Sequence, residues 1–188
     1  VNLFDADYNQ IEAQLIDPDS EVCRFLPDNI ILWLATDKLY EEFLDLAQNE
    51  RSHFADILIK KLQTYWDLIA AHTHARIIQP NFTEIDDKVL GQYSCKTEGF
   101  FTYQIRKLNF LLEEAMSKNP RVYPVDLLAL QIQLGQERFY DPVLYYHAKM
   151  SISLDALPFV AKAVTDVLQA IYGKMKKCVV LDLDNTLW

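Results

Sequence analysis

Short apolar runs alternate along the chain with longer stretches in which apolar residues recur at helical spacing. The runs of strand length are NIILWLAT (29–36), ARIIQPNF (75–82), VYPVDL (122–127) and CVVLDLD (178–184). The first shows no polar alternation, which is typical of a strand covered on both faces. The opening VNLFDADYN predicts one more strand, followed by a short helix that ends at Ile16.

Helical periodicity fills the intervals between these runs. Apolar residues at helical spacing predict helices within 39–69, with a polar break at 48–51, and within 103–116. A short helix is expected to end at Gly135, and a last amphipathic helix spans 157–171 before Gly173. The polar stretch 83–99 and the aromatic stretch 138–150 predict loops.

The order of these elements predicts an α/β fold. Strands that alternate with helices favour a mostly parallel sheet with helices on both faces, which is a three-layer sandwich of flavodoxin-like type. Ligands in such folds bind at the carboxyl edge of the sheet, so polar residues directly after a strand are candidates for a site. Asn81 follows the second run in this way, although an asparagine that forms a turn or a cap is the alternative.

Charge and composition narrow the classes of function. The chain has 27 acidic and 18 basic residues, and its net charge of −9 disfavours binding to nucleic acid. The longest apolar stretch, 30–35, is too short to span a membrane. Three cysteines without paired spacing fit a reducing compartment, so we expect a cytoplasmic protein.

The run VVLDLDNTLW at 179–188 carries the clearest chemistry. Asp182 and Asp184 follow an apolar strand two positions apart, a spacing that puts both carboxylates on one side of an extended chain. One carboxylate can attack phosphorus, the second can act as general acid and base, and a shared Mg²⁺ can neutralise charge. The alternative is an acidic turn after a buried strand, without chemistry.

Four apolar residues followed by Asp-x-Asp-x-Thr-Leu resemble the first motif of the haloacid-dehalogenase (HAD) superfamily. The resemblance implies that Asp182 is the nucleophile and Asp184 the general acid/base. It also implies that the Asp182 carboxylate and the Asp184 backbone carbonyl bind Mg²⁺. That superfamily adds a Ser or Thr, a Lys and an acidic pair later in the chain. We therefore expect 176–188 to be the truncated start of such a domain, and this chain alone to be inactive as a phosphatase.

The sequence before the motif resembles a narrower family. DPVLYYHAKMSISLDALPFVAKAV (141–164), followed by KKCVVLDLDNTLW (176–188), is similar to the FkbH-like proteins, the HAD-superfamily phosphatase subfamily IIIC. DYNQIEAQLIDPDSEVCRFLPDNIIL and NFTEIDDKVLG fit the same family. The resemblance implies an N-terminal α/β domain at 1–175. It also implies loading of a glyceryl or related acyl group, from a phosphorylated substrate, onto an acyl carrier protein.

The N-terminal domain of that family is similar in fold to the SGNH hydrolases, which makes ester hydrolysis a further alternative. Those enzymes need a Gly-Asp-Ser and an Asp-x-x-His, but the four residues from Asp141 are Asp-Pro-Val-Leu and His147 comes six positions later. Asn81 stands roughly where those hydrolases keep an oxyanion-hole Asn. Asp141, Tyr146 and His147 belong to an aromatic segment that suits a pocket lining, with packing against the last helix as the alternative.

Two functions therefore stay open for residues 1–175. They belong to a phosphatase or acyl-group loader, or they form a non-catalytic scaffold that binds a carrier protein or a substrate. Carrier proteins are usually acidic, so a scaffold of net negative charge would need a basic patch such as Arg106-Lys107 to receive one.

Overall fold

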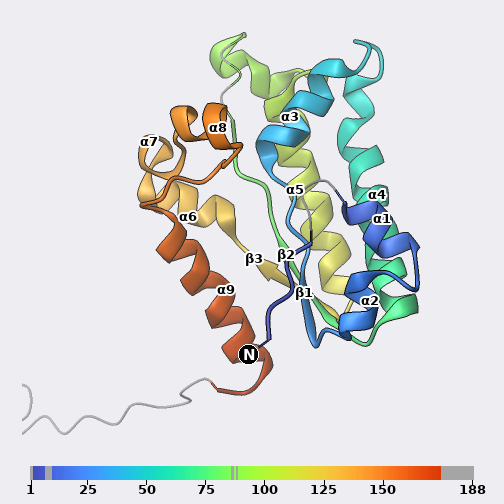
Figure 1. Ribbon diagram of the computed structural model, residues 1–188. Coiled ribbons are helices and arrows are strands. Elements are labelled where there is room, and N and C mark those ends of the chain that lie inside the picture. The colour runs from blue at the N-terminus through green and yellow to red at the C-terminus, as the bar shows by residue number, and fades with distance from the viewer. Residues whose placement is uncertain (1, 7–9, 86, 88, 175–188) are drawn as a thin grey trace, which may run out of the picture.

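A computed structural model describes residues 2–6, 10–85, 87 and 89–174. Within these residues the strands β1 (Asn29–Ile31), β2 (Arg76–Pro80) and β3 (Val122–Val125) form one parallel sheet in the order β1-β2-β3. Ile30 pairs with Ile77, and Ile77 pairs with Val122. Helices cover both faces of the sheet (Figure 1). The predicted three-layer α/β architecture with a parallel sheet is confirmed.

The helices divide between the two faces in chain order. The first half of the chain supplies one layer, with α1 (Ile11–Ile16), α2 (Glu21–Phe25), α3 (Thr36–Asp45), the 3-10 turn η1 (Arg51–His53), α4 (Phe54–His72), the 3-10 turn η2 (Gly91–Lys96) and α5 (Phe101–Lys118). The second half supplies the other, with α6 (Leu127–Leu134), α7 (Gln136–Phe139), α8 (Pro142–Ala148) and α9 (Leu157–Ile171). Figure 1 shows the two groups on opposite sides of the strands.

The apolar run 29–36 forms a strand only over its first part. After Ile31 the chain keeps a backbone hydrogen bond to β2, from Leu32 N to Ile78 O at 3.0 Å, and α3 already begins at Thr36. The expected polar break is confirmed, because α3 ends at Asp45 and α4 begins only after η1. Residues 2–6 form no strand, so the predicted opening strand is wrong for the part of it that the structure describes. The run 178–184 lies outside the described residues.

The aromatic segment 138–150 was expected to be a loop, and that prediction is wrong. Most of it belongs to α7 and α8. The Asp141 carboxylate accepts bonds from Val143 N at 2.9 Å and Leu144 N at 3.1 Å, and Pro142 occupies the first position of α8. A capping Asp followed by Pro is a helix-start signal, and the density of aromatic residues concealed it.

Each face of the sheet has its own apolar core. Ile77 points into the larger one, where Phe43, Phe54 and Phe101 meet with ring centroids 5.4 to 6.2 Å apart. Ile78 points into the smaller one, formed with α6, α7 and α9. This second layer leaves β1 partly uncovered, because Ile31, in register with the fully buried Ile78, is 45% exposed.

The backbone that leaves β2 is buried without a strand partner on each side, and a side-chain amide supplies the missing bonds. Asn109 of α5, 6% exposed, donates from Nδ2 to Phe82 O at 2.7 Å. Its Oδ1 accepts from Phe82 N at 2.9 Å. One amide therefore pairs with both polar groups of a residue that is itself fully buried, as a neighbouring strand would.

The next two residues are held in the same way from two other helices. Thr83 N donates to Thr36 Oγ1 at 3.1 Å, at the start of α3. Glu84 N donates to Gln131 Oε1 at 2.8 Å, and Gln131 Nε2 donates to Glu84 O at 2.8 Å. Residues from α3, α5 and α6 thus fix the path of the chain at the carboxyl edge of the sheet.

We expect Asn109→Leu to destabilise the protein strongly, because it leaves two buried backbone groups of Phe82 unpaired. At about 1–3 kcal/mol for each unpaired group, the free energy of unfolding falls by about 2–6 kcal/mol. Urea unfolding followed by circular dichroism measures the change. Asn49→Leu, an exposed position in a turn, is the matched control and should change stability by less than about 0.5 kcal/mol. Equal stability of the two variants would contradict this account of the amide.

Candidate functional site

Asn81 lies at the carboxyl edge of the sheet, where the sequence predicted a site. It is 7% exposed, and Nδ2 donates to Asp126 Oδ1 at 2.8 Å while Oδ1 accepts from Leu128 N at 3.1 Å. Asp126 also caps α6 by accepting from Ala129 N at 2.9 Å. Both ends of the Asn81 amide therefore tie the end of β2 to the start of α6. A role for Asn81 in binding a ligand stays a prediction. One N–H of its side-chain amide is not used by these bonds.

The other weak candidates lie on α8 and do not join Asn81. Asp141 is the cap of that helix. Tyr146 is 80% exposed and its ring meets the ring of His147 edge-on, with centroids 5.2 Å apart. Among the described residues no hydrogen bond or ring contact links these three residues to Asn81. The residues predicted to be catalytic, Asp182 and Asp184, lie outside the described part of the chain.

A buried carboxylate that the sequence did not reveal stands beside this edge. Asp37, the second residue of α3, is only 7% exposed. Burial raises the pKa of its carboxyl above the ordinary value, although the facing side chains of Ser151 and Tyr140 act in the opposite direction. Burial and the charge of Asp37 in turn raise the pKa of Tyr140. In the sequence, Asp37 is indistinguishable from any acidic residue in a first helical turn.

One helical turn further along α3, a second carboxylate holds α8. Glu41 accepts from the Tyr145 hydroxyl at 2.7 Å and from Lys149 Nζ at 3.1 Å. These two bonds lower the pKa of Glu41, while burial and the Glu41 contact raise that of Tyr145. The two carboxylates of α3 therefore both face the segment 140–151 and hold it against α3.

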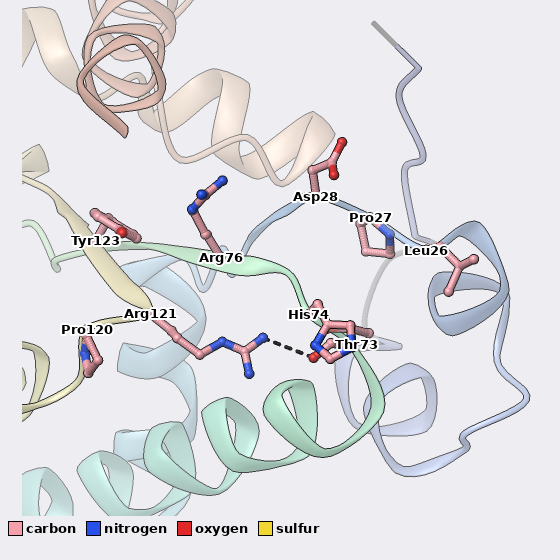
Figure 2. Close-up of a pocket in the computed structure, with 9 residues that line it drawn as sticks. All are labelled: Leu26, Pro27, Asp28, Thr73, His74, Arg76, Pro120, Arg121 and Tyr123. Atoms are coloured by element: carbon pink, nitrogen blue, oxygen red, sulfur yellow. Dashed lines mark hydrogen bonds between the residues drawn. The ribbon is translucent and has the colours of Figure 1, made fainter. Parts of the chain in front are cut away.

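A pocket of about 500 Å³ opens at the opposite edge, where the strands begin (Figure 2). Its lining includes Asp28, Thr73, His74, Arg76, Arg121 and Tyr123. Arg121 Nη2 donates to Thr73 O at 3.0 Å and to Ala75 O at 2.7 Å, just beyond the end of α4. The Arg76 guanidinium lies 5.2 Å from the centroid of the Tyr172 ring, beyond the end of α9. Sequence reasoning missed this pocket, since its residues come from three separate segments of the chain.

Two other kinds of feature are absent from the described residues. No group of three or more His, Cys, Asp or Glu side chains in this part of the chain is placed to hold a metal ion. Within the same residues, no helix has the length and apolar character needed to cross a membrane.

We expect Asp37→Asn to raise the melting temperature at pH 7. The folded state holds the Asp37 proton more tightly than the unfolded state, so wild-type stability falls as pH rises from the ordinary carboxyl pKa of about 4 through the raised one. Asn cannot ionise, so the advantage of the variant should shrink as the pH is lowered to about 3.5. Thermal unfolding over this pH range measures it, with the exposed Asp67→Asn on α4 as the control. A variant whose advantage grows towards acid pH would contradict the raised pKa.

Comparisons with known proteins identify the family. The model of the FkbH N-terminal domain matches residues 1–169. A crystal structure of the N-terminal part of the protein BF1531 from Bacteroides fragilis, described as containing a phosphatase domain and complexed with Mg, matches with a TM-score of 0.87 and 34% sequence identity. The match covers 100% of this chain and 49% of that one, so this chain spans about half the length of its relative. A comparison with curated proteins returned no match.

The family match covers nearly all of the described fold, including the sheet, the amide-held segment after β2 and most of α9. The structural match extends over the whole chain at an identity that supports more than a shared fold. The chain therefore belongs to the FkbH family, and its residues 1–169 are the N-terminal domain of that family.

Proposed function

We propose that this chain is the N-terminal part of a Mg²⁺-dependent phosphatase or phosphotransferase that works through an aspartyl phosphate. The proposal rests on one observation: in this chain an FkbH N-terminal domain, residues 1–169, is followed by the motif VVLDLDNTLW at 179–188. The relative from Bacteroides fragilis supports it, because that protein contains a phosphatase domain and was crystallised with Mg.

In this proposal Asp182 and Asp184 divide the chemistry. The Asp182 carboxylate attacks phosphorus and the bond to the leaving oxygen breaks, while Asp184 gives that oxygen a proton. Asp184 then takes a proton from water, which attacks the aspartyl phosphate and releases inorganic phosphate. Carboxylate and carbonyl oxygens are ligands that suit Mg²⁺, which would supply charge neutralisation when bound to Asp182 and the Asp184 carbonyl.

Residues 1–174 have a supporting role in this proposal. The polar groups at the carboxyl edge already serve the fold: Asn81 and Asp126 bond to each other and to α6, and Asp141 caps α8. The residue three positions after Asp141, where an SGNH hydrolase needs its His, is Leu144. These observations favour a scaffold over an independent ester hydrolase.

Loading of a glyceryl or related acyl group onto an acyl carrier protein is the finer form of the proposal. The basic patch suggested for such a partner is not favoured by the geometry. Arg106 makes two bonds of 2.6 Å to the carboxylate of Glu84, and Lys107 lies 2.6 Å from Asp56 Oδ2. Because both cations are paired with carboxylates, a carrier protein would have to dock on another surface. We also propose that the protein is cytoplasmic.

We expect Asp182→Asn, in a chain that carries the complete phosphatase domain, to lower Mg²⁺-dependent phosphate release by about three orders of magnitude or more, as loss of a nucleophile does. Colorimetric phosphate release measures activity, and circular dichroism checks the fold. Asp155→Asn, exposed and ahead of α9, is the control that should keep activity. Residues 1–188 alone should release no phosphate. Full activity of the Asp182→Asn variant would end the assignment.

A further inference from the structure

The pocket at the amino edge of the sheet contains two arginines that form no ion pair with any of the described residues. Ion pairs among the described residues involve Lys61, Arg106, Lys107, Lys118, Lys149 and Lys162, and neither Arg76 nor Arg121 takes part in one. His74 stands beside them, and Asp28 is the acidic residue of the lining. Both guanidinium groups are half-buried, and the burial of a charge without a partner is costly.

Both guanidinium groups are held in position without using up their positive charge. Arg121 is fixed by its two bonds to the carbonyls of Thr73 and Ala75, which occupy both hydrogens of Nη2. Arg76 lies over the Tyr172 ring in a cation–π contact, and the Tyr172 hydroxyl accepts a bond from Asn29 Nδ2 at 2.8 Å. A cation–π contact is made with the ring and does not require the N–H donors of the guanidinium as hydrogen bonds do.

The pocket therefore presents a preorganised donor to an anion. The side chain of Arg76 makes no hydrogen bond to any residue of the described chain, so its fork of donors suits the oxygens of a phosphate or carboxylate. Figure 2 shows the two guanidinium groups on different sides of the start of β2. A single phosphate would thus contact Arg76, while a ligand that fills the 500 Å³ would also approach Arg121.

We propose that this pocket binds the phosphate group of a small phosphorylated molecule, with Arg76 as the direct contact. The choice of phosphate over other anions rests on the proposed phosphotransfer function. The inference that the pocket binds an anion rests on the two arginines and does not require that function. The ligand is held at the edge of the sheet opposite to the one where α/β folds usually bind ligands, which is already occupied by side-chain amides and caps.

The test is a titration followed by nuclear magnetic resonance, with the whole chain carrying Asp182→Asn and with EDTA present. This background removes the proposed phosphotransfer site from the measurement, so failure of the pocket and failure of the enzyme assignment are told apart. The probes are inorganic phosphate, the ester glycerol 2-phosphate, and acetate at equal ionic strength. We expect saturable shifts around Arg76 and Tyr123, with the ester bound at least as tightly as inorganic phosphate and acetate bound more weakly.

Arg76→Gln should raise the dissociation constant for phosphate about tenfold or more, as loss of a charge-assisted contact does. The matched control is Arg138→Gln, because the Arg138 guanidinium also lies over a ring, 5.7 Å from the centroid of Phe159, yet Arg138 does not line the pocket. This control should change binding by less than twofold. Circular dichroism confirms that both variants are folded.

The proposal would be overturned by unchanged phosphate binding in Arg76→Gln, by an equal loss of binding in Arg138→Gln, or by acetate binding as tight as that of phosphate. An ester that binds more weakly than inorganic phosphate would also contradict it, because the volume of the pocket should accommodate the remainder of a phosphorylated molecule.

Discussion

A chain that leaves the middle strand of a buried sheet carries its peptide groups into the core, where water cannot bond to them. In this protein the groups after β2 find partners on side chains from three helices, chiefly the amides of Asn109 and Gln131. An unpaired buried peptide group costs about 1–3 kcal/mol, which is large against a typical net stability of 5–15 kcal/mol. The positions of α3, α5 and α6 are therefore tied to one short stretch of backbone.

The same bonds explain why this edge looks unlike a ligand site, although its fold class predicts one. Asn81 and Asp126 are polar residues in the expected places, but they bond to each other and to the start of α6. Asp37 is buried, and the Glu41 carboxylate accepts hydrogen bonds from Tyr145 and Lys149. The amino edge differs, because the Arg76 side chain makes no hydrogen bond within the described part of the chain and contacts the Tyr172 ring instead.

Sequence patterns predicted the strand and helix order well where periodicity was long. The helices α4, α5 and α9 and the break before α4 were predicted because each has an apolar stripe or a polar interruption. The length of β1 was not predictable, because Leu32 and Leu34 pack into the core whether or not the backbone is a strand. Long-range partners were not predictable either: nothing local distinguishes Asn109 from an exposed helical asparagine, or Arg76 from a paired arginine.

The side chains that hold the chain after β2 also bear on the order of events in folding. Asn109 is 27 positions from Phe82 in sequence, and Thr36 and Gln131 are each 47 positions from their partners. Such contacts raise the contact order and cannot form until residues on both sides of β2 have come together. The carboxyl edge should therefore order late and, once formed, exchange its amide hydrogens only through a large cooperative opening that separates α3, α5 and α6.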